Sequence, residues 1–214
     1  MPKEPEARRR LGPQRDPAID AAVLDATRRL LVEKGYAGTS IDAIAALAGV
    51  GRPAIYRRWP SKAHIVNDAI YPELNAEPGA GEDTVLDVGG TMTEQVRALV
   101  HGAVALFAAP ATRAAAPALM SEVHTDEALR YALVERQRAG VRAELTRRLD
   151  EAAARGEVRA GIDADVLLDI MAGAAIYAMS ARDVDDSESF ADALTGIVLH
   201  GILPGGQVGE GAAE

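Results

Sequence analysis

The 214-residue chain has no cysteine, and only 4% of its residues are aromatic. The lack of cysteine excludes disulfides and thiolate nucleophiles. No apolar run approaches the roughly 18 residues of a membrane span, and the basic N-terminal residues lack the apolar segment of a signal peptide. We therefore expect a cytoplasmic protein that does not associate with membranes.

Motifs of common enzyme classes are also missing. The sequence has no G-x-S-x-G, no glycine fingerprint for phosphates and no H-E-x-x-H. His101 and His124 lack metal-ligand spacing, and the acidic residues Asp183, Asp185 and Asp186 are expected to form a solvated loop rather than a cation site. We predict that the protein is not an enzyme, and we assign no catalytic residue, no cofactor and no metal.

The charge is distributed unevenly along the chain. The net charge is −9, but residues 1–70 hold 12 Lys and Arg against 8 Asp and Glu, a balance of +4. Residues 71–214 hold 11 Lys and Arg against 24 Asp and Glu, a balance of −13. A basic head on an acidic body is typical of a protein that binds a polyanion at one end. The acidic body would repel DNA and so help to orient its docking.

Helical periodicity dominates the sequence, and strand-like alternation never exceeds a few residues. We predict an all-α fold of about nine helices, in which an N-terminal three-helix DNA-binding domain precedes a helical ligand-binding and dimerisation domain. The predicted boundaries are a disordered basic arm at 1–16, a helix-turn-helix domain at 17–62, an effector-binding and dimerisation domain at 63–204, and a flexible tail at 205–214. The helices are predicted at 17–34, 41–48, 52–58, 62–71, 91–108, 110–123, 126–155, 163–181 and 187–203.

Residues 39–62 carry the most informative local pattern, TSIDAIAALAGVGRPAIYRRWPSK. Gly49 stands where the chain must reverse, because glycine tolerates a positive φ. Ala45 is small enough for a second helix to cross closely, and Pro53 suits the first turn of that helix. Tyr56 and the following arginines give the second helix phenolic and cationic groups. The pattern predicts a helix-turn-helix that fits the major groove of DNA.

The segment from about residue 18 to 70 resembles the DNA-binding domain of the TetR family of bacterial transcriptional regulators. The matching elements are Gly35-Tyr36, Thr39-Ser40, Ile44-Ala45, Ala48-Gly49-Val50, Ile55-Tyr56 and Trp59-Pro60-Ser61-Lys62. The rest of the chain fits the family in length and helical character but shows no diagnostic motif. For Tyr36 and Trp59 we expect core packing rather than contact with DNA.

The resemblance implies roles for ten residues. Those expected to face bases are Gly51, Arg52, Pro53 and Ala54, with Arg57 as a further candidate. The family commonly has polar residues at the positions of Gly51 and Ala54, so most base reading would be left to Arg52, whose guanidinium can bond guanine O6 and N7 together. The residues expected near phosphates are Thr39, Ser40, Tyr56, Arg58 and Lys62. Arginines 8–10 could reach a minor groove, although plain disorder is the alternative.

A three-helix head of this size touches one half-site, so specific binding to a palindromic operator requires a two-fold dimer. Two apolar stripes near the C-terminus suit that role. The predicted interface residues are Val166, Ile170, Ala174, Phe190, Leu194, Ile197 and Val198. The resemblance implies that these two helices pair with their symmetry mates, and packing within one chain is the alternative for the same residues.

The resemblance also implies a ligand pocket among the middle helices. The candidate lining residues are Val96, Val100, Phe107, Met120, His124, Tyr131, Met171 and Tyr177, each of which could instead be ordinary core. The implied function is a repressor that an unknown small-molecule effector releases from its operator. The alternative is a DNA-binding regulator that senses no small molecule and acts constitutively or through a protein partner.

Overall fold

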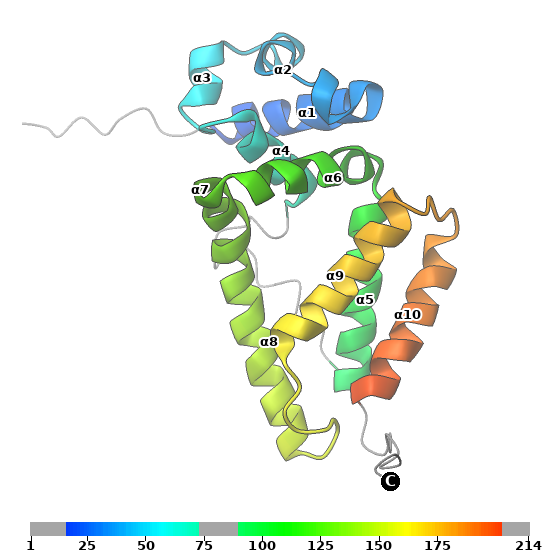
Figure 1. Ribbon diagram of the computed structural model, residues 1–214. Coiled ribbons are helices and arrows are strands. Elements are labelled where there is room, and N and C mark those ends of the chain that lie inside the picture. The colour runs from blue at the N-terminus through cyan, green and yellow to red at the C-terminus, as the bar shows by residue number, and fades with distance from the viewer. Residues whose placement is uncertain (1–15, 73–89, 203–214) are drawn as a thin grey trace, which may run out of the picture.

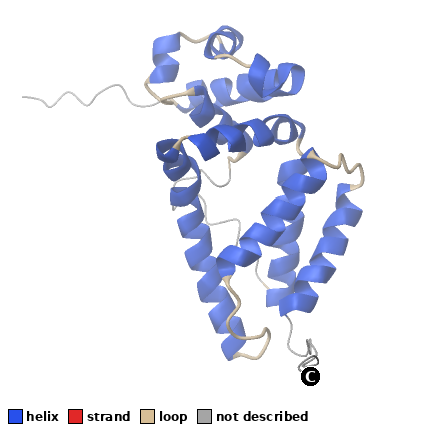
Figure 2. Ribbon diagram, viewed as in Figure 1, coloured by secondary structure: helices blue, strands red, loops and turns tan. Residues whose placement is uncertain are grey.

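The computed structural model describes residues 16–72 and 90–202, and every regular element in these ranges is helical (Figures 1 and 2). The predicted all-α fold is confirmed. The described residues form ten α-helices and one short π-helical segment, whereas about nine helices were predicted. Predictions for the basic arm and for the tail beyond residue 202 lie outside the described residues.

The difference in number arises in the stretch predicted as one helix over 126–155. The structure divides it into α7 (Glu127–Arg130), the π segment η1 (Tyr131–Glu135) and α8 (Arg136–Ala154). Asp126 caps the first piece, because its side chain accepts a hydrogen bond from the backbone N–H of Leu129 at 3.0 Å. A π turn lets in an extra residue without ending the helical path, and residue spacing alone does not reveal such a turn.

The head consists of α1 (Pro17–Gly38), α2 (Ile41–Ala48), α3 (Arg52–Tyr56) and α4 (Lys62–Ile70). Asp16 caps α1 by accepting from the N–H of Ala18, and Pro17 occupies the first helical position, where the sequence predicts the helix to begin. Helical geometry breaks at Gly35, just after the predicted helix end at residue 34, with φ 67° and ψ −179°. This break turns Tyr36 inward, where it is only 8% exposed.

The body is built from α5 (Met92–Ala108), α6 (Pro110–Thr125), α8, α9 (Ala164–Ser180) and α10 (Ser187–Ile202). The central helix α5 packs against both α9 and α10, and α6 runs across the top of the body, where it touches α5 and α9 directly beneath the head (Figure 1). Thr91 and Glu94 form a reciprocal capping box that starts α5, and the side chain of Asp163 caps α9.

The hydrophobic core joins head and body. A smaller cluster lies entirely within the head and includes Val23, Ile44, Ile55 and Trp59. The larger cluster contains residues of α5 to α10 together with five residues of the head. These five are Leu31, Tyr36, Ala63, Val66 and Ile70. Packing therefore runs across the predicted domain boundary at residue 62, and α6 touches both α1 and α4.

Among the described residues, no single helix is long and apolar enough to cross a membrane. Helices α5 and α6 satisfy length and composition only when they are taken together, and they meet at a bend of 87°.

Candidate DNA-binding surface

The turn between α2 and α3 is set by local residues. Ser40 caps α2 through its Oγ, which accepts from the N–H of Ala43 at 3.2 Å. Gly49 ends α2 in the left-handed conformation, with φ 67° and ψ 29°, which a side chain would disfavour. The N–H of Val50 then bonds the carbonyl of Ala45 at 3.0 Å. These contacts reverse the chain within three residues and place α3 across α2.

Helix α3 presents a cationic outer face. Ile55 is fully buried beneath it, whereas Arg52, Pro53, Tyr56 and Arg57 are exposed. Gly51 precedes the helix and is exposed, and Ala54 is half-buried. Six predicted base-facing or phosphate-facing residues thus lie on or beside one short helix. The arrangement offers hydrogen-bond donors and small apolar groups, the two chemistries that base edges in a major groove accept.

Arg52 does not stand alone on this face. Its Nε lies 3.0 Å from Oδ1 of Asp42, which is in the first turn of α2. Its Nη2 donates to the hydroxyl of Tyr56 at 3.5 Å, and the guanidinium lies 5.9 Å from the centre of that ring. Tyr56 and the negative charge of Asp42 raise the pKa of Arg52 above its ordinary value, so the group is charged at any physiological pH.

Lys62 begins α4 at the edge of the same region. Its Nζ donates to the backbone carbonyl of Tyr36 at 3.1 Å and lies 3.9 Å from the centre of the Tyr36 ring. Two contacts therefore fix an ammonium group at the N-terminus of a helix. Ser40 is exposed at the start of α2. The N-termini of α2 and α4 are therefore both suited to phosphate binding, because helix N-termini bind anions.

Two predicted DNA contacts are placed differently by the structure. Thr39 is 2% exposed, and its hydroxyl donates to the carbonyl of Gly35 at 2.8 Å, since the break in α1 turns that carbonyl toward it. The side chain of Arg58 is 10% exposed and is paired with Asp20 of α1. Its Nη1 also donates to the carbonyl of Ala54 at 3.2 Å. Both side chains hold the head together rather than face outward.

The structure adds a contact that sequence reasoning missed. The hydroxyl of Tyr36 donates to a carboxylate oxygen of Glu122 on α6, 86 positions away along the chain. Burial and the Glu122 carboxylate raise the pKa of Tyr36 above its ordinary value. Lys62 contacts the same tyrosine. Tyr36 therefore connects α6 of the body with the first residue of α4. The family resemblance at Gly35-Tyr36 draws attention to the tyrosine, but no neighbouring residue in the sequence indicates that Glu122 is its partner.

The eight predicted pocket residues do not come together. Val96, Val100, Phe107 and Met171 belong to the large core cluster. The other four are exposed: Met120 by 53%, Tyr131 by 66%, Tyr177 by 62%, and His124 as well. A helical stripe identifies a buried face, but it does not distinguish residues of the core from residues that line a cavity.

Two clefts occur elsewhere in the described body, and neither is lined by those eight residues. One, of about 140 Å³, is lined by Met92, Gln95, Arg147, Arg148, Glu151 and Arg155. The other, of about 270 Å³, lies between η1, α8 and α9 and includes Arg138, Arg142, Asp165 and Asp169. Both clefts are bordered by ion pairs.

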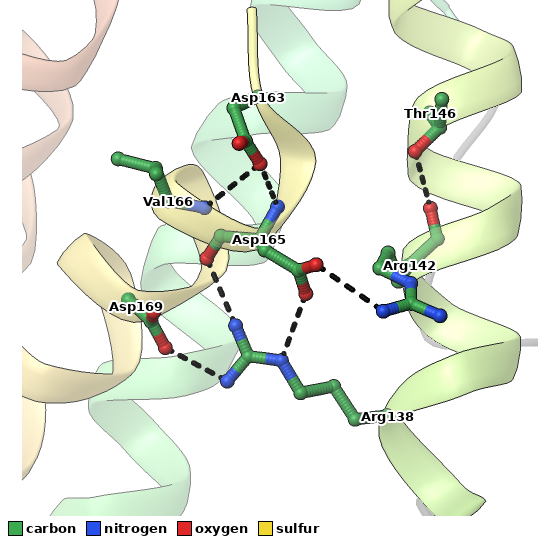
Figure 3. Close-up of polar contacts among 7 residues, drawn as sticks. All are labelled: Arg138, Arg142, Thr146, Asp163, Asp165, Val166 and Asp169. Atoms are coloured by element: carbon green, nitrogen blue, oxygen red, sulfur yellow. Dashed lines mark hydrogen bonds and ion pairs between the residues drawn. The ribbon is translucent and has the colours of Figure 1, made fainter. Parts of the chain in front are cut away.

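Figure 3 shows how Arg138 joins α8 to α9 at the larger cleft. Its Nε lies 3.1 Å from Oδ1 of Asp165, its Nη1 lies 2.7 Å from Oδ1 of Asp169, and its Nη2 donates to the carbonyl of Asp165 at 2.9 Å. Arg142 also contacts the Asp165 carboxylate, at 3.3 Å. Every side-chain charge named here is compensated by a neighbour, so the cluster acts as a clamp between two helices.

The predicted interface residues divide into an exposed and a buried set. Val166, Ile170 and Ile197 are 53%, 47% and 71% exposed. Ala174 and Phe190 are half-buried. Leu194 and Val198 are 7% and 6% exposed and pack within the chain. The exposed Tyr177 continues the stripe of Val166 and Ile170 along α9, so an apolar face remains on α9 and α10.

Residues with metal-binding side chains do not gather in the described ranges, where no group of three or more could hold an ion. His101 lies 3.2 Å from Asp192 of α10. In the predicted acidic loop, Asp183 is paired with Arg113, and Asp186 accepts from the N–H of Ser189 at 2.9 Å.

Known proteins share both parts of this architecture. A DNA-binding transcriptional repressor TetR from Mycobacteroides abscessus is 29% identical over 150 residues, which cover 70% of this chain and 76% of that protein. A TetR transcriptional regulator from Streptomyces coelicolor superposes with a TM-score of 0.54 at 25% identity and covers 87% of this chain and 99% of that one. The transcriptional regulator FadR from Bacillus subtilis, solved in complex with stearoyl-CoA, superposes with a TM-score of 0.60 at 16% identity. The match covers 83% of this chain and 96% of FadR.

Two family models match in addition. The model for bacterial regulatory proteins of the tetR family matches residues 23–69, which contain the helix-turn-helix. The model for the tetracyclin repressor-like C-terminal domain matches residues 87–198, more than half of the chain. The protein therefore belongs to the TetR family of bacterial regulatory proteins and is a DNA-binding transcriptional regulator.

Proposed function

We propose that the protein is a homodimeric repressor that binds a palindromic operator and that a small-molecule effector releases it. The observation that carries this proposal is the position of α6, which packs on α1 and α4 of the head and also contacts α5, α7 and α9 of the body. A body helix in direct contact with the DNA-binding head is the element through which a bound effector could act. The relative named as a repressor supports the direction of regulation.

In this proposal α3 enters the major groove. Arg52 reads guanine, Pro53 and Ala54 contact thymine methyls, and Gly51 allows close approach of the backbone. Arg57 supplies a second cation on the exposed side of the helix. Ser40, Tyr56 and Lys62 contact phosphates and so position the head without reading sequence.

The apolar face of α9 and α10 forms the dimer contact. Val166, Ile170, Tyr177 and Ile197 are each between 47% and 71% exposed, a high exposure for large apolar side chains on two helices that both pack against α5. Burying them against a second copy would place two α3 helices on one face of DNA, about 34 Å apart or a multiple of it.

The dimer contact is tested by sedimentation of Ile197→Glu. The variant is expected to shift wild-type dimers toward monomers at micromolar concentration, because the new carboxylate would be buried without a partner. Val32→Glu is the matched control, since Val32 is 57% exposed on α1, away from this face. Equal dimerisation of wild type and Ile197→Glu would refute the assigned interface.

The effector is tested by a competition experiment. Operator sites are first selected from randomised duplexes, and a panel of apolar acids and acyl thioesters is then screened for thermal stabilisation of the protein. FadR, the relative solved with stearoyl-CoA, motivates the acyl-CoA part of the panel. A true effector must weaken DNA binding at least tenfold, a coupling of about 1.4 kcal/mol, and DNA must weaken its binding by the same factor. Compounds that stabilise the protein without this reciprocity are not effectors.

A second candidate function is a regulator that senses no small molecule. The clefts of about 140 and 270 Å³ favour it, because both are smaller than the roughly 300–1,000 Å³ of typical ligand pockets and both are bordered by paired charges. Under this alternative, no compound of the panel would change DNA affinity, and the protein would act constitutively or through a protein partner.

A further inference from the structure

An acidic side chain stands on the surface that is proposed to face DNA. Asp42 is in the first turn of α2, its side chain is 67% exposed, and its carboxylate lies 3.0 Å from Nε of Arg52. A carboxylate this close to DNA is repelled by phosphates. Capping of α2 does not require it, because Ser40 already provides the cap. Its contact with Arg52 therefore calls for a separate explanation.

The contact fixes the orientation of the Arg52 guanidinium. This group has five N–H donors in one plane. Asp42 forms an ion pair with Nε at 3.0 Å, and Tyr56 accepts a hydrogen bond from Nη2 at 3.5 Å. Three donors on the two terminal nitrogens remain for a base. Guanine O6 and N7 need two donors together, so enough donors remain. The contacts with Asp42 and Tyr56 fix the orientation of the guanidinium plane.

We infer that Asp42 is a specificity-determining residue that positions Arg52 for guanine and opposes binding to non-cognate DNA. The inference rests on the proposed function, in which Arg52 reads guanine. At a cognate site, Arg52 shields the carboxylate while its free donors bond the base. At a site without guanine, Arg52 gains nothing that offsets the repulsion between Asp42 and the phosphates. Asp42 thus weakens binding overall but widens the gap between right and wrong sequences.

The expected size of the effect follows from the exposure of the pair. The side chains of Arg52 and Asp42 are 55% and 67% exposed, and exposed ion pairs of this kind contribute a factor of roughly two to five. Asp42→Asn should therefore lower discrimination for guanine by about two- to fivefold. It should also raise affinity for random DNA and make the salt dependence of that binding steeper, because one negative charge is removed.

The test selects sites from randomised duplexes with four full-length proteins and measures preference at every position by sequencing. These are the wild type, Arg52→Ala, Asp42→Asn and Asp25→Asn. The last is a charge-matched control on α1, where Asp25 is paired with Arg28 rather than with the DNA-facing residues. Arg52→Ala should abolish one guanine preference per half-site, Asp42→Asn should weaken that same preference, and Asp25→Asn should leave it intact. Denaturation of each variant confirms that it is folded.

Three results would overturn the inference, and they are distinguishable. If Arg52→Ala keeps the full pattern, the proposed base contact is wrong and the role of Asp42 falls with it. If Arg52→Ala loses the guanine but Asp42→Asn discriminates like the wild type, only the positioning role is wrong. If Asp42→Asn instead loses a cytosine preference at another position, then Asp42 reads a base directly by accepting from cytosine N4.

Discussion

Replacing Tyr36 by Phe should weaken the junction between head and body without disturbing the DNA-binding surface. The change removes only the hydroxyl that donates to Glu122 of α6. Phenylalanine keeps the buried ring, the backbone carbonyl that accepts from Lys62, and the aromatic face 3.9 Å from its ammonium group. The substitution therefore separates the contact with α6 from the contact with α4.

The magnitude follows from the charge and exposure of the partner. Hydrogen bonds to charged groups contribute about 1.5–3 kcal/mol. Glu122 is exposed, so its carboxylate can regain water when the phenol is lost. We therefore expect the free energy of unfolding to fall by about 1–2 kcal/mol, near or below the lower end of that range. For a chain of this size, the melting temperature would drop by roughly 3–6 °C.

Urea denaturation at fixed protein concentration measures this loss, since the stability of a dimer depends on concentration. Tyr56→Phe is the control, because it removes a hydroxyl from a side chain that is 47% exposed and should change stability by less than about 0.5 kcal/mol. Combining Tyr36→Phe with Glu122→Gln should add little to the first change, because both act on one bond. An unchanged midpoint for Tyr36→Phe, or an equal loss in the control, would refute the reasoning.

Three further predictions concern other contacts. Lys62→Ala should weaken binding to all DNA sequences alike and reduce the slope of log affinity against log salt by about 0.9 in titrations at several salt concentrations. Arg138→Ala, which opens the clamp between α8 and α9, should lower the free energy of unfolding by about 1 kcal/mol in urea at neutral pH. Burial raises the pKa of Tyr71 from 10.0 to about 12; its contribution to stability is therefore present below pH 10 and lost as pH rises through about 12, and Tyr71→Phe should flatten that alkaline decline.

The helix-turn-helix could be predicted in detail because its signals are local. Ser40 caps α2, Gly49 takes the left-handed conformation, and Pro53 lies in the first turn of α3. Each of these is a property of one residue and its nearest neighbours. The break at Gly35 was predictable for the same reason, since only glycine readily adopts a φ of 67°.

The structure departs from these expectations where a distant partner decides the position of a side chain. Arg58 resembles a DNA contact in sequence, but Asp20, 38 positions away, draws it into the head. Thr39 is expected near phosphates, but its hydroxyl donates to the carbonyl of Gly35. Periodicity assigns a residue to a helix face but does not identify what packs against that face. The predicted pocket residues divide on this point, because Val96 and Met171 are buried in the core while Met120 is exposed.

The shared core constrains how an effector could release DNA. Ala63, Val66 and Ile70 of α4 belong to the same cluster as the body helices, and Tyr36 joins that cluster while bonding Glu122. Bending the chain at residue 62 would expose this apolar surface, at about 25 cal/mol per Å². Moving the head together with α6 would leave the surface buried. In the proposed switch, an effector would therefore act by shifting α6 relative to α9 and α10, so that the two heads of a dimer separate while each head keeps its contacts with its own body.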